Sequence, residues 1–177
     1  SEAVLEATGK ERNAAFIRNE ETGGAGRIKI INSNVKGKSY YPALYSVGYI
    51  FVDGGMVECT STADSAIWAI KDIMLKGGAK LVLDGKYPSG CGGEFYMHAA
   101  EVIAKNTNQE NIPAIDYERE IMVLEDYHFT YAMAEDSEGA KIDLIERDET
   151  KFLNLYKKVH FKTEPIMLVY EIPFVKE

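Results

Sequence analysis

Cysteine is scarce in this sequence. Cys59 and Cys91 are the only two among 177 residues. Two cysteines are too few for a disulfide framework, and their spacing does not form the C-x-x-C pattern of many metal sites. We therefore expect reduced thiols, no bound metal and a cytoplasmic site of action, with a single disulfide left open.

Positive charge is also in short supply. The chain carries 20 Lys and Arg against 28 Asp and Glu, which gives a formal net charge of −8 and an isoelectric point near 5.0. No basic cluster or stripe offsets this charge, so phosphate backbones and anionic membranes would be repelled. We expect neither a direct nucleic-acid partner nor membrane association.

Long apolar runs are missing as well. The longest falls far short of the ~18 residues that span a bilayer, and no basic-then-apolar signal peptide opens the chain. The chain begins with Ser1 rather than Met, so removal of upstream residues stays open, as does a secreted or injected effector.

What the sequence does contain is the composition of a folded protein. Hydrophobic residues make up 46% and charged residues 27%, close to the averages for soluble globular proteins. Together with the length, this favours a single domain over residues 1–177. No internal repeat stands out.

The apolar pattern predicts short strands mixed with a few helices. Apolar residues at intervals of three or four predict a helix over residues 66–74, which a pair of glycines would end. Further helices are expected at residues 2–13, 42–47, 96–104 and 148–159. Strands are expected at residues 14–17, 28–31, 49–52, 56–60, 79–83, 121–124, 129–134, 141–145 and 166–172. This mixture indicates an α+β fold rather than regular βαβ alternation.

An acidic pair precedes one of the expected strands. Glu118 and Glu120 are two residues apart, so in a strand their side chains would project to the same face. Two carboxylates held together repel each other unless a cation or a cationic transition state lies between them. Because the chain has 28 acidic residues, such a pair also arises by chance. The motifs around the pair therefore decide whether it indicates a functional site.

Hydroxyl residues end an expected strand upstream of this pair. Ser61 and Thr62 follow the run 56–60. Either hydroxyl would cap a following helix by accepting from its free backbone N–H groups. The alternative is a role in a site shared with the glutamates.

In this order the motifs resemble those of the mono-ADP-ribosyltransferase family, including its toxins and its small bacterial or bacteriophage members. That family has an arginine on an early strand, a Ser-Thr-Ser strand end and then Glu-x-Glu. Here the middle motif reads Ser61-Thr62-Ala63, so its third position departs from the family. The resemblance implies two packed, mainly antiparallel β-sheets with flanking helices and an NAD cleft between them.

The resemblance also implies the reaction: NAD, as substrate, would be cleaved, nicotinamide released and ADP-ribose transferred to an arginine of a target protein. Glu120 would stabilise the oxocarbenium-like centre and bind a ribose hydroxyl, with Ser61 holding it in place. Glu118 would orient the acceptor guanidinium and receive its proton. Thr62 would line the NAD site, and Arg18 or Arg27 would hold the dinucleotide phosphates.

Other interpretations stay open. Tyr117 would either contact the target protein or pack in the core. If water rather than an arginine accepted the ADP-ribose, the enzyme would be an NAD glycohydrolase. Cys91 lies in a glycine-rich loop seven residues before His98, so a Cys-based deamidase or hydrolase is a second chemistry. A third alternative is a non-enzymatic module whose acidic face meets a basic partner. The oligomeric state cannot be read from the sequence.

Overall fold

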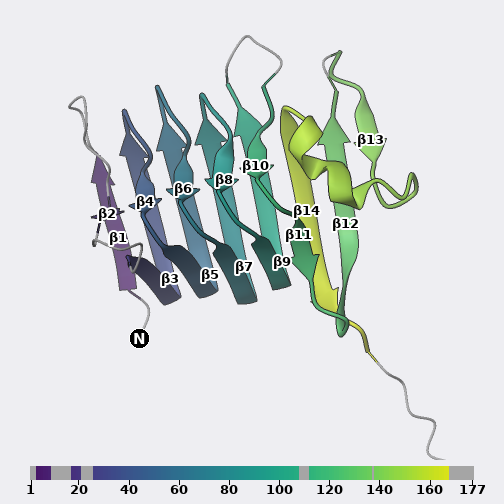
Figure 1. Cartoon of the computed structure of the whole chain (residues 1–177), viewed down its shortest axis with the longest axis horizontal. Coiled ribbons are helices and arrows are strands. Elements are labelled where there is room, and N and C mark those ends of the chain that lie inside the picture. The colour runs from purple at the N-terminus through teal and green to yellow at the C-terminus, as the bar shows by residue number, and fades with distance from the viewer. Residues whose placement is uncertain (1–2, 9–16, 21–25, 108–111, 137, 168–177) are drawn as a thin grey trace, which may run out of the picture.

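The chain winds as a β-solenoid in which successive turns stack side by side (Figure 1). The computed structural model describes residues 3–8, 17–20, 26–107, 112–136 and 138–167. Each of the central turns adds one long strand to a first sheet and one short strand to a second. Strand accounts for 63% of the residues and helix for 4%, so the architecture is almost entirely β.

The two sheets have simple strand orders. The long sheet runs β1-β3-β5-β7-β9-β14-β12-β13, with β11 also paired to β9, and the short sheet runs β10-β8-β6-β4-β2. The strands of the long sheet are β1 (Ala3–Thr8), β3 (Arg27–Ser39), β5 (Tyr49–Ser61), β7 (Ile73–Gly85), β9 (Phe95–Asn106), β11 (Ile121–Val123), β12 (Tyr127–Glu135), β13 (Lys141–Asp143) and β14 (Lys158–Pro165). Those of the short sheet are β2 (Ile17–Asn19), β4 (Leu44–Ser46), β6 (Ile67–Ala69), β8 (Ser89–Cys91) and β10 (Ile115–Tyr117).

The turns of the solenoid repeat at intervals of 22 or 23 residues. Parallel pairing places Ile28, Ile50, Ile73 and Phe95 in one row across β3, β5, β7 and β9. All four side chains point inward and are buried. Because burying such a side chain is worth about 1.5–3 kcal/mol, each turn stabilises its neighbours through these rows.

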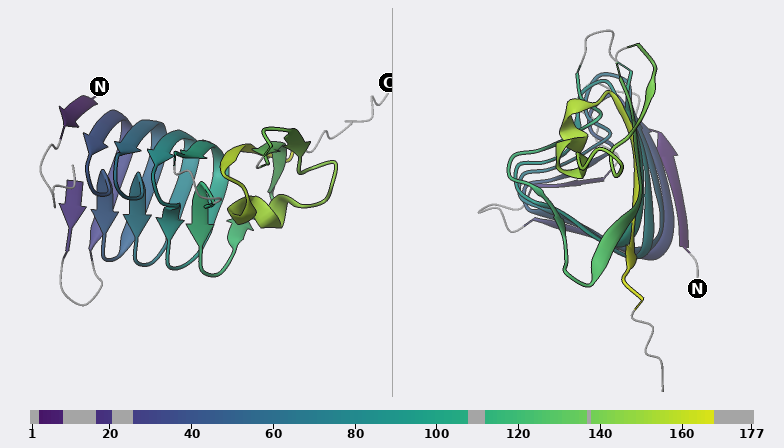
Figure 2. Two further views of the ribbon diagram at one scale, coloured as in Figure 1. Left: turned by 90° about the horizontal axis from the view of Figure 1, so that it is seen from above. Right: turned by 90° about the vertical axis from the view of Figure 1, so that its right-hand side faces the viewer.

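The long strands bend at a shared corner. The register aligns Asn32, Gly54, Gly77 and Ala99, and each has a positive φ, of 45°, 70°, 63° and 51°. This left-handed conformation strains most side chains and suits glycine best. The corner gives the turns the angular outline seen end-on in Figure 2.

Antiparallel strands end the stack on its C-terminal side. β14 pairs antiparallel with β9 and with β12, and the 3₁₀ helix η2 (Thr150–Leu155) lies beside them. Phe161 of β14 is fully buried, and its ring packs edge-on against Phe95 at 6.4 Å and Phe129 at 6.3 Å. The last parallel turn is therefore covered by a cap with its own aromatic contacts.

The expectation of an α+β, ADP-ribosyltransferase-like fold was wrong. The described residues form a β-solenoid in place of two mainly antiparallel sheets with flanking helices. The expected helix at 66–74 is β6, a corner and the start of β7, and the one at 96–104 lies in β9. Residues 42–47 contain β4, and only η2 within 148–159 is helical. Residues 3–8 of the expected first helix form β1, and its remaining residues lie outside the described ranges.

The physical cause is the corner of the solenoid. Ile67 and Ala69 point inward from β6, and Ile73 points inward from β7 after the chain has turned. A two-residue alternation interrupted by a corner imitates helical spacing. The strands expected at 28–31, 56–60, 79–83 and 129–134 do lie in strands, whereas most of 166–172 falls outside the described residues.

Candidate functional site

The acidic pair lies in the corner between β10 and β11. Glu118 and Glu120 are both exposed. Backbone hydrogen bonds connect this corner to the preceding turn of the solenoid. Glu118 N donates to the Cys91 carbonyl at 3.3 Å, and Phe95 N donates to the Glu120 carbonyl at 3.0 Å. Neither glutamate precedes a strand that flanks a cleft between two sheets, as the resemblance implied.

Ser61 lies far from that corner. It ends β5, whereas Glu120 precedes β11, and β7 and β9 lie between these two strands in the sheet. Three strand steps of about 4.8 Å separate them along the solenoid. The Ser61 hydroxyl is buried and already engaged, because it donates to the Tyr40 carbonyl at 3.1 Å and accepts from Asp64 N at 3.0 Å. Thr62 follows it as an exposed corner residue.

The two candidate arginines lie in the first described turn. Arg18, in β2, forms an ion pair with Glu20 and lies over the Tyr45 ring at 5.3 Å. Arg27 begins β3 and is exposed. The residues expected to bind NAD therefore lie in separate turns of the solenoid. Tyr117 is buried and donates to the Lys151 carbonyl at 3.0 Å, so it packs in the core.

Cys91 and His98 do not face each other. Cys91 points into the solenoid from β8, and burial, the largest cause, raises its pKa to about 11. His98 lies on the outer side of β9, where its ring stacks on Tyr127 at 5.6 Å. A buried, protonated thiol with no imidazole beside it is a poor nucleophile.

A different set of side chains comes together on the outer face of the short sheet. Its strands lie side by side in front of the long sheet in Figure 1. Parallel pairing places the outward residues of β2, β4, β6, β8 and β10 in one row, which reads Arg18, Tyr45, Trp68, Gly90 and Asp116. Two neighbouring aromatic side chains are therefore followed by a position without a side chain and then by a carboxylate.

Gly90 is required by a close approach of the backbone. A Cβ atom at this position would lie 1.8 Å from the Asp116 carbonyl oxygen. Glycine therefore lets β10 pack tightly beside β8, so the row has no side chain between Trp68 and Asp116. The outer face is hollowed beside these two residues.

This hollow is a groove of about 330 Å³. It is lined by Pro42, Tyr45, Asp64, Ser65, Trp68, Pro88 and Asp116. Tyr45, Trp68 and the two carboxylates are half-buried, so each keeps part of its side chain accessible. The groove lies within the usual size range of small-molecule sites, roughly 300–1,000 Å³.

Asp64 is held at the rim of the groove by local hydrogen bonds. Its backbone N–H donates to the Ser61 hydroxyl at 3.0 Å, and its carboxylate accepts from Ser65 N at 2.7 Å. Its carbonyl accepts from Lys86 N at 2.9 Å. Ser61, expected to position a catalytic glutamate, instead fixes the corner that carries Asp64.

The chemical character of the groove is aromatic and acidic. Ring faces carry partial negative charge and bind apolar C–H surfaces. Ionised carboxylates accept hydrogen bonds only. Such a site suits a ligand that combines flat C–H faces with many hydroxyl donors.

Sequence reasoning missed this groove because its residues come from separate turns. Trp68 lay within an expected helix, and neither Tyr45 nor Asp116 has a motif around it. The one available signal was spacing: Tyr45 and Trp68 lie one repeat apart in the chain and become neighbours in the sheet.

Within the described ranges no helix has the length and hydropathy that crossing a bilayer requires. The same part of the chain holds no group of three or more His, Cys, Asp and Glu placed to bind a metal ion. Comparisons with protein-family models, with curated proteins and with solved structures found no match for this chain.

Proposed function

We propose that this solenoid is a glycan-binding protein and that it binds a neutral oligosaccharide or polysaccharide in the Trp68 groove. The observation that carries the proposal is the groove lined by Tyr45, Trp68 and Asp116, in which two neighbouring aromatic residues and a carboxylate share one outer face. Asp64 supplies a second carboxylate at the same groove.

The residue types favour a sugar over other small ligands. A pyranose ring has a face of C–H groups that stacks on an aromatic ring, and its edges carry hydroxyl groups that donate to carboxylates. A purely apolar ligand would desolvate the carboxylates of Asp64 and Asp116 without donating a hydrogen bond to either, which is costly. The groove offers both the aromatic surface and the hydrogen-bond acceptors that a sugar requires.

Charge favours a neutral glycan over an acidic one. Asp64 and Asp116 both line the groove, and the chain carries a net charge of −8. Uronic acids and sulfated sugars would be repelled at short range, and this repulsion weakens only with salt. Arg18 is already paired with Glu20 at the far end of the row.

The solenoid also favours an extended ligand. Tyr45 and Trp68 are stacked along the solenoid axis, one strand spacing of about 4.8 Å apart. A polymer lying along this axis would contact one ring after another, whereas a single sugar uses only part of the row. We therefore expect affinity to rise with chain length.

Transfer of ADP-ribose from NAD stays a prediction without support from the site geometry. Glu120 and Ser61 lie three strands apart. The Ser61 hydroxyl already donates to the Tyr40 carbonyl and accepts from Asp64 N. The same holds for NAD glycohydrolysis. Cys91-based hydrolysis would require a thiolate that burial disfavours.

A depletion assay tests the proposal. The protein is incubated with cellulose, chitin, xylan, mannan, galactan and starch, and the unbound fraction is measured. We expect binding to at least one of these polymers, and Trp68→Ala should weaken it at least about tenfold, since aromatic stacking and its buried area together exceed about 1.4 kcal/mol.

Tyr131→Ala is the matched control. Tyr131 is an exposed aromatic residue on β12, in the other sheet. Its removal should leave binding unchanged. Failure of all six polymers to deplete the protein, or equal loss in both variants, would contradict the proposal.

A further inference from the structure

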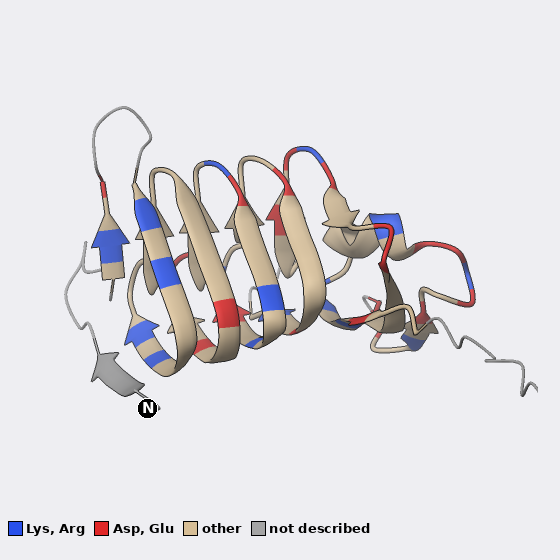
Figure 3. Cartoon of the chain, turned by 90° about the horizontal axis from the view of Figure 1, so that it is seen from below, with Lys and Arg blue, Asp and Glu red and all other residues tan. Residues whose placement is uncertain are grey.

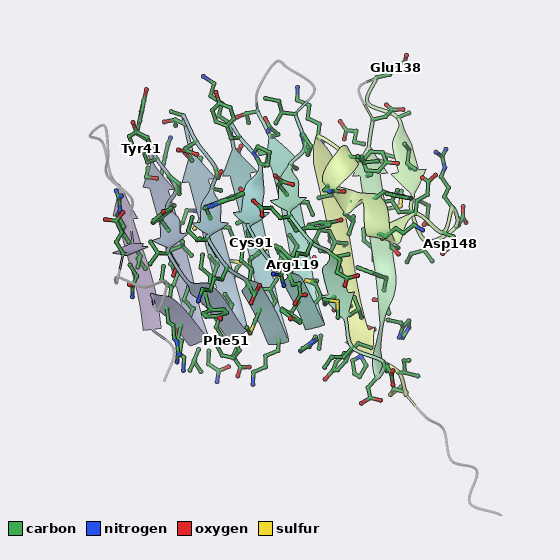
Figure 4. All side chains as sticks on the ribbon, viewed as in Figure 1. Tyr41, Phe51, Cys91, Arg119, Glu138 and Asp148 are labelled. Carbon is green, nitrogen blue, oxygen red and sulfur yellow. The ribbon has the colours of Figure 1, made fainter. Side chains whose placement is uncertain are left out.

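A second groove lies on the long sheet, away from the Trp68 groove. It has a volume of about 370 Å³ and is lined by Arg27, Ile28, Lys29, Tyr49, Phe51 and Met74. Tyr49, Phe51 and Met74 form its apolar part on β5 and β7. Phe51 lies at the lower edge of the molecule in Figure 4, well away from the short sheet.

Positive charges border this groove on two sides. In β3, Arg27 and Lys29 are the register partners of Tyr49 and Phe51, so each ring lies one strand spacing from a cation. On the other side the ammonium of Lys71 lies 5.3 Å from the centre of the Tyr49 ring, and that of Lys76 lies 5.2 Å from the centre of the Phe51 ring. Figure 3 looks onto this face and shows positive residues along β3.

Three of these cations, Arg27, Lys29 and Lys71, have no carboxylate partner among the described residues, whereas Lys76 pairs with Asp53. Most lysines on the long strands are paired, as in Lys36 with Glu58, Lys80 with Glu101 and Lys105 with Asp84. Neither Arg27 nor Lys29 forms such a pair with any acidic residue that the structure describes. Both are exposed and lie on the same side of β3.

We propose that this groove binds a nucleotide, with the base stacked on Phe51 and Tyr49 and the phosphate held by Arg27 and Lys29. A guanidinium and an ammonium side by side match a dianionic phosphate, and an arginine fork binds two of its oxygens at once. The rings supply the stacking surface that a planar base requires. The site is independent of the glycan groove.

The ligand is a mononucleotide rather than a nucleic-acid strand. Acidic charge begins at the border of this groove, where Asp53 pairs with Lys76 at 3.1 Å. A polymer would extend beyond the groove into the field of a chain with a net charge of −8. A short anion meets the cations without that cost.

Ligand-observed saturation-transfer NMR tests this site with AMP and adenosine as separate probes, and with inorganic phosphate as a competitor that displaces AMP. We expect saturable transfer to AMP, strongest at the adenine protons, and at least about tenfold weaker binding of adenosine and of phosphate alone, because a charged hydrogen bond or a stacked ring is worth about 1.5 kcal/mol or more. Lys29→Gln should weaken AMP binding by a similar factor.

Lys38→Gln is the matched control, since Lys38 is an exposed lysine of the same strand outside the groove. Its AMP affinity should equal that of the parent. Phe51→Leu should remove the strong adenine transfer while keeping an apolar side chain that preserves the fold. Circular dichroism checks that preservation.

The proposal is overturned by the absence of transfer to AMP at millimolar concentration, by equal affinity for AMP and either fragment, or by equal effects of Lys29→Gln and Lys38→Gln. A neutral oligosaccharide should not compete with AMP. Competition would mean that one shared site exists and would overturn the assignment to this groove, whereas failure of glycan binding would leave it untouched.

Discussion

Trp68 and Gly90 are register partners on β6 and β8, so an indole ring adjoins a position that has no side chain. The backbone of Asp116 fills the space that a Cβ atom at Gly90 would need. The row on the outer face of the short sheet therefore has no side chain between Trp68 and Asp116, and both residues line the groove beside it. The proposed glycan site depends on that groove.

The first prediction concerns Ser61. Its hydroxyl bonds to both Tyr40 and Asp64 in a buried corner. Ser61→Ala should lower the free energy of unfolding by about 1–2 kcal/mol, because both hydrogen bonds of this buried hydroxyl are lost and Asp64 N loses its acceptor. It should also weaken glycan binding, because one of the hydrogen bonds that hold Asp64 is removed. Urea unfolding and the polymer depletion assay measure these effects, and full stability in the variant would contradict the assigned role.

The second prediction compares two glycines at the bend. Gly55 and Gly78 have φ angles of 74° and 80°. A Cβ at Gly55 would lie 2.2 Å from the Ser33 carbonyl oxygen, whereas a Cβ at Gly78 would have no atom within 4 Å. Gly78→Ala should cost about 1 kcal/mol from backbone strain alone. Gly55→Ala should cost more than about 3 kcal/mol, since the neighbouring turn must also move.

Denaturant unfolding of the two variants measures this difference directly. Gly78→Ala serves as the control for the left-handed backbone, because it shares the conformation without the clash. Equal losses in the two variants would mean that the turns are not packed as tightly as the solenoid requires.

The third prediction concerns the thiols. Burial raises the pKa of Cys59 to about 12 and that of Cys91 to about 11. Both thiols are therefore protonated at pH 8, and neither should react with iodoacetamide until the protein is unfolded. Mass spectrometry after timed labelling measures this. Rapid labelling of Cys91 in the native protein would contradict its burial and revive a Cys-based enzyme.

The fourth prediction concerns pH. Burial of Glu101 raises its pKa, but hydrogen bonds from His160 and Lys80 together outweigh burial and leave the pKa below its ordinary value. Such a carboxylate adds stability above its unfolded pKa and loses it as pH falls through the folded value. Glu101→Gln should therefore cost about 1 kcal/mol at pH 7 and progressively less below about pH 4.

Thermal unfolding of the parent and of Glu101→Gln between pH 3 and pH 7 measures this trend. Glu138→Gln is the control, because Glu138 is an exposed carboxylate without an ion pair among the described residues. A cost of Glu101→Gln that does not change with pH would contradict the ion-pair account.

Several individual strands could be predicted from the sequence, but their stacking into a solenoid could not. The runs 28–31 and 79–83 are β-branched or apolar and indeed lie in β3 and β7. The repeat stayed hidden because equivalent positions differ in type: the bend is Asn32, Gly54, Gly77 or Ala99, and the outer row changes from Tyr45 to Asp116. Only the apolar character of the inward-facing residues recurs, at intervals of 22 or 23 residues. Within each turn, a corner interrupts the two-residue alternation of inward and outward side chains.

The candidate site was unpredictable for a related reason. Tyr45, Trp68 and Asp116 belong to different turns and meet only through the register of the short sheet. By contrast, the motif around Ser61 and Glu120 is ordered along the chain in a suggestive way, but parallel stacking separates its members by three strands. Order in sequence does not imply proximity in a solenoid.

The most direct test of glycan binding uses the single tryptophan of the chain. Because Trp68 is the only Trp and lines the groove, its fluorescence reports on this site alone. Titration with a hexasaccharide of whichever polymer depletes the protein should shift Trp68 emission to shorter wavelength in a saturable way, and the disaccharide should bind more weakly. Saturable binding of the hexasaccharide by calorimetry without any change in Trp68 emission would contradict the assignment of the glycan site to this groove.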